Sequence, residues 1–312
     1  MSPAHDIRLR RLGLLLGAAG AVLFSAKAIL AKLQFLQGLD ALDVLALRML
    51  FSFPLFALLA VRQTLLVRRR AQPAPGVRDW WLIVLVGLLG YYLASFLDFR
   101  GLEYVPVSLE RLILFLNPTL VLLLGLFFFG RAVTPRQWLA MGVCYLGVVL
   151  VFGENLRVQG DHIAFGSLLV FGSAVSYALY LALSGELVRR IGSLRLVAYA
   201  MCVSTLATAV HYLGLRDIAP LLSFPWQVYA LALANAVFCT FLPVTFTMRA
   251  VELVGPGPAA QLSVLGPVSL LFLGGFVLGE PVTWLQLIGT VVVLSGVAVL
   301  SRPAANSLPL PK

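Results

Sequence analysis

Charged side chains are scarce in this chain, at 12% of its 312 residues, whereas soluble proteins carry about a quarter. Acidic residues are the rarer sign, with 13 Asp and Glu against 23 Lys and Arg. Hydrophobic residues amount to 61%, so polar side chains are too few to cover a water-exposed surface. The composition therefore indicates an integral membrane protein. The net charge of +10 does not predict nucleic-acid binding, because Lys and Arg of membrane proteins gather in the loops on one side.

Cysteine and histidine are also few. Cys144, Cys202 and Cys239 each lie in an apolar segment, which indicates buried thiols rather than a disulfide framework. The three His residues are scattered and no CxxC pair occurs, so the sequence predicts no metal site and no cofactor. It also lacks a nucleophile and base in a catalytic pattern. We therefore expect a protein that is not an enzyme.

Long apolar windows dominate what is present and predict an all-α polytopic membrane protein. Loops between the windows are rich in Pro and Gly. Ten transmembrane helices are predicted, at residues 12–31, 44–66, 80–99, 106–129, 136–153, 163–184, 196–214, 226–246, 257–278 and 283–301. The basic start and apolar run of the first window resemble a secretory signal. We interpret it as a retained helix, because its Gly13 and Leu15 recur as Gly166 and Leu168.

The chain also contains an internal repeat, found by aligning it with itself at an offset of 149 residues. Without a gap, seven residues of the first half fall on identical residues of the second. These are Glu103 on Glu252, Pro118 on Pro267, Gly125 on Gly274, Gly130 on Gly279, Thr134 on Thr283, Gln137 on Gln286 and Gly147 on Gly296. Two related halves are expected, residues 1–155 and 156–302, followed by a disordered tail at 303–312.

Most Lys and Arg residues lie at the termini and in alternate loops. By the positive-inside rule, both termini are predicted to be cytoplasmic. Five spans per half is an odd number, so the two halves are expected to have inverted topology. Inverted repeats place a binding site between two half-bundles that can open alternately to either side of the membrane. This arrangement predicts a transporter.

One motif of the second half resembles a known family. Pro267 is followed by the run LGEPVTWLQ at 278–286 and then by Gly296, a pattern similar to the EamA domain of the drug/metabolite transporter superfamily. The resemblance covers nearly the whole chain as two tandem repeats. It implies ten helices, a central cavity lined mainly by helices 1, 3, 4, 6, 8 and 9, and movement of small metabolites, often outward. The first half departs from the pattern, because Arg131 stands where the second half has Glu280. We expect Glu280 to be a helix-end carboxylate that caps the next helix.

Five charged residues lie inside predicted spans, all in the outer third of the membrane: Lys27, Arg48, Asp98, Glu110 and Arg111. A charge in hydrocarbon costs about 2.5–3.5 kcal/mol, so each needs water, a partner or a ligand. Lys27 with Glu110, and Arg48 or Arg111 with Asp98, are candidate pairs. In one interpretation they form a structural ion-pair layer. In the other, Lys27 and Glu110 bind substrate, while Asp98, Arg111 and Arg48 serve coupling or ion pairing.

Glu110 shares a helical face with Asn117, whereas Arg111 points about 100° away, so we expect Glu110 to face the cavity. Pro118 and Pro267 each remove a backbone hydrogen bond at matched positions and are predicted hinges, with static kinks as the alternative. The predicted substrate-binding residues are Lys27, Glu110, Asn117, Tyr177, Tyr180, Phe24, Tyr92 and Gln261.

The mixed charges favour a secondary transporter of amino-acid-like or other zwitterionic metabolites, exporting them across the bacterial inner membrane by alternating access. The surplus of buried base over acid leaves an organic-anion or phosphorylated-metabolite exchanger as an alternative. A membrane scaffold or receptor is the non-transporter alternative. The expected partners are a small molecule, the lipid bilayer and, for coupling, protons. Both proton-driven and facilitated transport remain open at this point.

Overall fold

The computed structural model describes residues 3–69, 75–130, 133–159, 162–254, 262 and 265–300, in which all regular structure is helical. The predicted tail at 303–312, Gln261 and Arg131 lie outside these residues. The helices are α1 (Pro3–Phe35), α2 (Ala41–Arg69), α3 (Val77–Gly87), η1 (Leu88–Leu93), α4 (Ala94–Leu102), α5 (Val107–Leu114), α6 (Asn117–Phe129), α7 (Pro135–Gln159), α8 (His162–Ile191), α9 (Ser193–Leu215), α10 (Ala219–Leu222), α11 (Trp226–Ala236), η2 (Val237–Phe241), α12 (Leu242–Val254), α14 (Leu265–Leu278) and α15 (Trp284–Leu300).

Eight helical segments in the described part of the chain are long and apolar enough to cross a membrane. They coincide with the first eight predicted spans, and the all-helical membrane class is thereby confirmed. The predicted span at 283–301 forms the shorter apolar helix α15. Of the predicted span at 257–278, the structure describes α14 and residue 262. The predicted boundary after residue 155 falls inside α7, which continues to Gln159.

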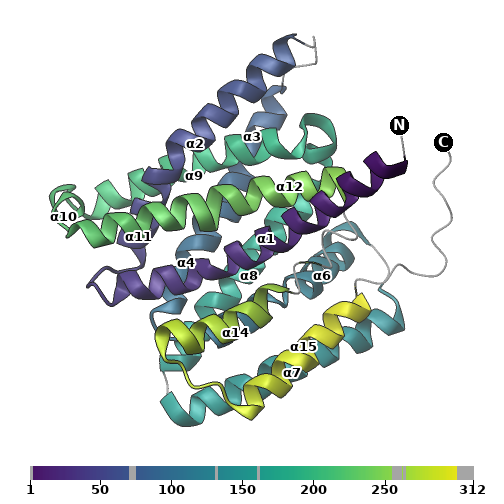
Figure 1. Ribbon diagram of the computed structural model, residues 1–312, viewed down its shortest axis with the longest axis vertical. Helices are drawn as coiled ribbons and strands as arrows, with labels where there is room; N and C mark the ends of the chain where they lie inside the picture. Colours follow the sequence, from purple (N-terminus) through teal and green to yellow (C-terminus); the bar gives the residue numbers. More distant parts are fainter. Residues whose placement is uncertain are drawn as a thin grey trace.

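Helices that are distant in the sequence pack side by side (Figure 1). The long helix α1 lies against α12 and α14, while α8 lies against α4 and α6. Helix α2 packs against α9 and α11, and α7 packs along α15 at the lower edge of the view. Every one of these pairs joins a segment before residue 160 to a segment after it. The two halves of the sequence are therefore interleaved rather than placed beside each other.

Glycines allow the closest of these contacts. A Cβ added at Gly147 of α7 would lie 2.8 Å from the carbonyl oxygen of Gly289 in α15. A Cβ at Gly296 of α15 would lie 2.8 Å from the carbonyl oxygen of Ala140 in α7. Between them, the Cys144 thiol lies 3.6 Å from the carbonyl oxygen of Val293. The backbones of α7 and α15 thus approach closely enough to exclude side chains, as small residues permit in membrane helices.

The fourth predicted span is broken in two. Helix α5 ends at Leu114, a turn follows at 115–116, and α6 begins at Asn117 with Pro118 in its first turn. Proline has no N–H to donate to the carbonyl four residues earlier, and its ring crowds that carbonyl. The fourth span is therefore interrupted just before Pro118, whereas the use of Pro118 as a hinge stays a prediction. Pro267 lies within the continuous helix α14.

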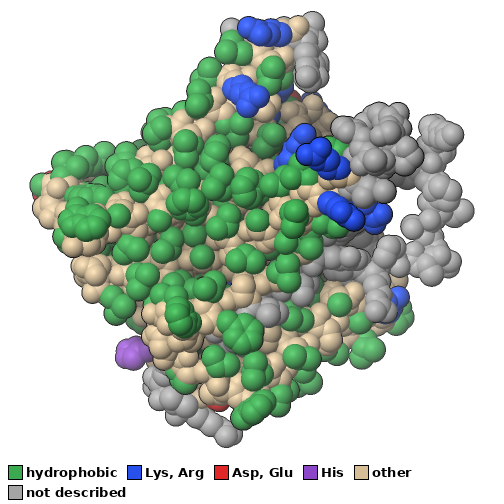
Figure 2. All heavy atoms as spheres, in the orientation of Figure 1, with side chains coloured by type: hydrophobic (Ala, Val, Ile, Leu, Met, Phe, Trp, Pro, Cys, Tyr) green, Lys and Arg blue, Asp and Glu red, His purple; other side chains and the backbone are tan. Residues whose placement is uncertain are grey.

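Basic side chains gather at one end of the molecule. Figure 2 shows most Lys and Arg of the visible face at the end where α1 begins. Exposed residues there include Arg8 and Arg11 at the start of α1 and Arg69 at the end of α2. The opposite end, where α1 turns into α2, carries a different arrangement in which acids and bases are paired.

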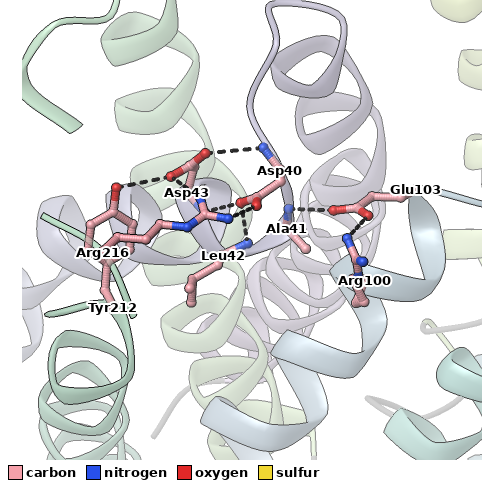
Figure 3. A network of polar contacts seen from close by, with 8 residues as sticks. All are labelled: Asp40, Ala41, Leu42, Asp43, Arg100, Glu103, Tyr212 and Arg216. Carbon is pink, nitrogen blue, oxygen red and sulfur yellow. Dashed lines mark hydrogen bonds and ion pairs between the residues drawn. The ribbon is translucent and has the colours of Figure 1, made fainter. Parts of the chain in front are cut away.

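Figure 3 shows this paired network. Arg216, just after α9, makes ion pairs with Asp40 and Asp43, the latter at 3.1 Å. The Tyr212 hydroxyl donates to the same Asp43 oxygen at 3.1 Å. On the other side, Glu103 accepts a hydrogen bond from the Ala41 N–H at 2.6 Å and pairs with Arg100. The start of α2 is thus tied to the ends of both α9 and α4.

This network predicts a pH dependence of stability. Burial opposes ionisation of Asp40, but hydrogen bonds and charge from Arg216 outweigh it and lower the pKa of the Asp40 carboxyl. A lowered pKa contributes stability above the unfolded value of about 3.9, and this is lost as pH falls through the folded value. Since both side chains are more than a third exposed, we expect about 0.5 kcal/mol. Melting of purified wild type and Arg216→Gln between pH 3 and pH 7 tests this. The difference between the two should shrink at the acidic end, and a constant difference would contradict it.

Candidate functional site

A cavity of about 440 Å³ lies inside the described helices. Its walls come from both halves of the chain: α1, α2, η1 and α4, the junction of α5 and α6, α8, α9, η2 and α12, and single residues of α14 and α15. Most of the lining is apolar or aromatic, and a few charged groups lie among it. Such a mixture is typical of a small-molecule site, in which apolar walls give contact and sparse polar groups orient the ligand.

Two short π-helical segments face this cavity from opposite halves. Segment η1 supplies Gly90 and Tyr91 to the wall, and η2 supplies Cys239 and Thr240. The two segments begin 149 residues apart, at Leu88 and Val237, which is the offset of the internal repeat. A π-helical turn inserts one extra residue into a helix and is frequent at functional sites. The same local distortion therefore occurs at equivalent positions of the two halves, and both copies line the cavity.

The central ion pair of the site joins Lys27 of α1 to Asp98 of α4. Lys27 Nζ lies 2.5 Å from Asp98 Oδ2, and both side chains are buried, at 7% and 2% exposure. The ammonium group also lies 5.4 Å from the centre of the Phe99 ring. Our sequence-based pairing of Lys27 with Glu110 was wrong. Asp98 of α4, rather than Glu110 of α5, lies next to Lys27.

Arg111 and Glu110 are adjacent on α5 but point in different directions, one toward the cavity and the other into the protein interior. Arg111 lines the cavity, whereas Glu110 is 0% exposed and does not belong to the lining. The expectation that Glu110 faces the cavity was therefore wrong, because α5 is a separate helix whose rotation is not continuous with that of Asn117 on α6. Arg111 Nη2 donates to the Ser25 carbonyl at 3.4 Å, and its Nε lies 3.9 Å from Glu110.

Arg48 completes the charged part of the cavity. Its Nη2 donates to the Ser95 hydroxyl at 2.7 Å, and its guanidinium group lies 4.9 Å from the centre of the Phe99 ring. The expected pairing of Arg48 or Arg111 with Asp98 is not the arrangement observed, since Lys27 occupies Asp98 Oδ2. The Nε atoms of Arg48 and Arg111 are buried without a hydrogen-bond partner among the described residues. Neither guanidinium group therefore uses all of its donors within the described residues.

Aromatic side chains form the wall contributed by η1 and α8. The Tyr91 and Tyr180 hydroxyls lie 3.0 Å apart, and the rings of Tyr177 and Tyr180 are 5.3 Å apart. Of the predicted substrate-binding residues, Lys27, Phe24, Asn117, Tyr177 and Tyr180 line the cavity, as does the predicted hinge Pro118.

Two other predicted residues lie elsewhere. Tyr92 is not among the residues of the cavity wall, and its hydroxyl lies 2.8 Å from His211 Nδ1. Tyr91, its neighbour, faces the cavity instead. Gln261 falls outside the described residues. Ser95 was missed, although Tyr91, Ser95 and Asp98 are spaced by four and three residues, which places them on one helical face.

Glu280 has a different partner from the one predicted. Its Oε1 accepts a hydrogen bond from the Val107 N–H at 3.1 Å, so it caps α5 of the first half rather than the next helix. The next helix, α15, is capped by the side chains of Thr283 and Gln286, and Thr134 with Gln137 caps α7 in the same way. The T-x-x-Q part of the repeated motif is thus a capping box. Burial raises the pKa of the Glu280 carboxyl despite the Val107 N–H.

Gly90 makes room for the tyrosine wall, which leads to a testable prediction. A Cβ at this position would lie 2.6 Å from Cδ2 of the Tyr180 ring. Gly90→Ala should therefore displace Tyr180 and lower transport about tenfold, as overpacking costs about 1–3 kcal/mol. Gly185→Ala on α8, where no atom lies within 4 Å of the new methyl group, is the control. Equal activity of Gly90→Ala and Gly185→Ala would contradict the prediction.

The fold and the cavity define a polytopic membrane protein of the transporter class. The chain belongs to the EamA-like transporter family, whose profile matches residues 11–153 and 164–302. It is 30% identical over 282 residues to "Uncharacterized transporter YcbK" of Bacillus subtilis (strain 168), covering 86% of each chain. It is 25% identical over 235 residues to "Probable amino-acid metabolite efflux pump" of Escherichia coli (strain K12), covering 68% of this chain and 75% of that protein.

Among solved structures, one titled "Crystal structure of protein" is similar, with a TM-score of 0.61 and 18% identity over 92% of this chain and 95% of that chain. At this identity the similarity concerns the fold alone.

Proposed function

We propose that this protein is a secondary transporter that exports small zwitterionic, amino-acid-like metabolites. The observation that carries the proposal is the buried Lys27–Asp98 pair at the cavity wall, with two guanidinium groups close by. A zwitterion presents one carboxylate and one ammonium group. Arg111 and Arg48 suit the carboxylate, because guanidinium groups bind carboxylates with two parallel hydrogen bonds. Asp98 suits the ammonium group, because Lys27 holds its Oδ2 while its Oδ1 has no donor among the described residues.

The rest of the substrate would lie against the apolar walls. Phe24, Tyr177 and Tyr180 surround the space next to the charges, so a small aliphatic or aromatic side chain would contact carbon rather than water. The name of the Escherichia coli relative, an amino-acid metabolite efflux pump, supports the same substrate class and the outward direction.

Alternating access between two inverted repeats of five helices each, ten in all, is the proposed mechanism. Two sets of contacts support it: α1 with α12 and α14, and α8 with α4 and α6. The internal repeat relates α1 to α8, α12 to α4 and α14 to α6, so the two sets are equivalent contacts. The reciprocal packing of Gly147 and Gly296 between α7 and α15 also supports a two-fold relation. The break before Pro118 supplies a place where α5 and α6 can change their angle.

The proposed location is the bacterial inner membrane, with both termini in the cytoplasm. Support comes from the exposed Arg residues where α1 begins, because basic loops stay on the cytoplasmic side. The network around Arg216 would then lie at the outer end. It would keep that end closed in the present conformation.

An organic-anion or phosphorylated-metabolite exchanger is the second candidate. It is favoured by the surplus of base in the cluster, where Lys27, Arg48 and Arg111 face Asp98 and Glu110. The full-length protein in liposomes tests both candidates, by counterflow of a panel of radiolabelled amino acids, dicarboxylates and sugar phosphates. Amino-acid flux that a protein-free liposome lacks would support the first candidate, and anion flux alone would replace it with the second. Absence of flux for the whole panel would favour a scaffold or receptor.

A further inference from the structure

The carboxyl group of Glu110 lies buried behind the cavity wall and is not used by the proposed substrate contacts. It is 0% exposed, and neither of its oxygens receives a hydrogen bond from a nitrogen or hydroxyl donor of the described residues. Arg111 Nε lies 3.9 Å from Glu110 Oε2, and the other polar group beside the Glu110 carboxyl is the side-chain carboxyl of Asp98. Asp98 Oδ2 holds Lys27, whereas Asp98 Oδ1 is buried without a donor. Unpartnered oxygens of two acids therefore lie in one desolvated space.

Two ionised carboxylates in contact repel each other, and a buried carboxylate without donors is costly. A single proton placed between them removes both problems, because a carboxyl O–H can donate to the neighbouring carboxylate. Paired carboxylates that share one proton are a known solution to this arrangement in proteins. The geometry of Asp98 and Glu110 has the same elements.

The surrounding cations do not replace that proton. Lys27 and Lys32 approach from α1, Arg48 from α2 and Arg111 from α5 itself. Lys27 is already bound to Asp98 Oδ2, and Arg48 donates to Ser95. Arg111 Nη2 donates to Ser25, and its Nε stays 3.9 Å from Glu110, beyond hydrogen-bond distance. None of the described cations therefore supplies a hydrogen bond to Glu110.

We propose that Asp98 and Glu110 form a proton-binding pair, and that this proton and the ammonium group of the substrate exclude each other. This inference rests on the proposed function for its substrate. An ammonium group arriving at Asp98 brings a positive charge and N–H donors beside the pair. It replaces the O–H donor to Asp98 Oδ1, and the proton passes from Glu110 through Asp98, the acid of the pair that reaches the cavity, to water there. One proton is then exchanged for one substrate molecule, so proton entry drives substrate export.

The location of the pair suits this exchange. Asp98 reaches the cavity while Glu110 does not. The substrate would therefore contact Asp98 directly and affect Glu110 only through Asp98. Asp98 belongs to α4 and Glu110 to α5, the helix that ends at the break before Pro118. A change in proton occupancy would therefore alter the contact between α4 and α5, next to the discontinuity in the fourth span.

Proton binding can be measured without any substrate. Infrared difference spectra of the purified full-length protein between pH 5 and pH 9 should show the band of a protonated carboxyl that is lost at the alkaline end. The band should be absent from Glu110→Gln. Asp79→Asn is the matched control, since Asp79 is also buried, at 4% exposure, but pairs with Arg190 of α8 at 2.8 Å. Persistence of the same band in Glu110→Gln would overturn the proton site.

Coupling is measured in liposomes as the ratio of radiolabelled L-amino acids, supplied as a mixture, between the two sides of the membrane. The membrane potential is clamped to zero by potassium and valinomycin. For one-for-one exchange, a gradient of one pH unit should support about tenfold accumulation, because one unit corresponds to about 1.4 kcal/mol. This ratio should fall to about one in Glu110→Gln and stay tenfold in Asp79→Asn. Wild-type flux that ignores the pH gradient would overturn the inference while leaving the proposed function standing. An infrared band that behaves as expected without any amino-acid flux would instead overturn the proposed function and retain the proton site.

Discussion

Replacing Lys27 with methionine is expected to lower transport about 100-fold. The ammonium group of Lys27 is the partner of Asp98 inside the cavity, at 2.5 Å. Removing one member of a buried charge pair leaves the other uncompensated, at a cost of about 3–5 kcal/mol. The variant should therefore lose stability as well as activity. Initial rates in liposomes and thermal melting in detergent measure the two effects separately.

The double variant Lys27→Met with Asp98→Asn distinguishes folding from function. Both members of the pair are absent, so neither is left as an unpaired buried ion, and the melting temperature should return toward that of wild type. Transport should stay low, because the carboxylate proposed to receive the ammonium group of the substrate is gone. If the single Lys27→Met variant folds and transports normally, the charge cluster does not form the substrate site.

Replacing Gly147 with alanine is expected to separate α7 from α15. The new methyl group would lie 2.7 Å from Val293 Cγ2 and 2.8 Å from the Gly289 carbonyl oxygen. The second of these atoms belongs to the backbone and cannot rotate away, so the helices must move apart. Overpacking of this kind costs about 1–3 kcal/mol, which corresponds to a fall in melting temperature of roughly 5 °C.

Gly142→Ala is the matched control for this change. It lies on the same helix, and no atom lies within 4 Å of an added Cβ, so its melting temperature should stay constant or rise, because alanine favours helix. Gly296→Ala should behave like Gly147→Ala, since its methyl group would meet the Ala140 carbonyl oxygen at 2.8 Å. Equal melting temperatures for Gly142→Ala and Gly147→Ala would contradict the packing argument.

The sequence predicted the position of the charged residues along the helices but not their partners. Lys27, Arg48, Asp98 and Arg111 line one cavity, whereas Glu110 does not. Which charged residues pair depends on the rotation of each helix about its own axis. A rotation of about 100° points a side chain where the adjacent residue in the sequence pointed before. Glu110 and Arg111 differ by that rotation, and the break before Pro118 removed the continuity with Asn117 on which the prediction relied.

The shared spacing of the T-x-x-Q motif in both halves shows the same difference at the helix ends: local contacts follow from the sequence, and long-range contacts do not. Its capping geometry is local, since Thr283 and Gln286 are three residues apart, and it could be predicted from spacing alone. Glu280 bonds to Val107, which is 173 residues away in the sequence. A contact of this kind depends on how the two halves interleave, which no local pattern reports.

By itself the sequence determined the membrane class, the positions of the spans, the internal repeat and the family resemblance, because apolar length, residue spacing and self-similarity are properties of the chain alone. The tertiary structure decided that Lys27 pairs with Asp98, that Glu110 lies behind the cavity wall, and that two π-helical turns line the same cavity. The physical reason is that these features depend on helix rotation and on local changes in helical pitch. Both are set by packing between segments far apart in the chain.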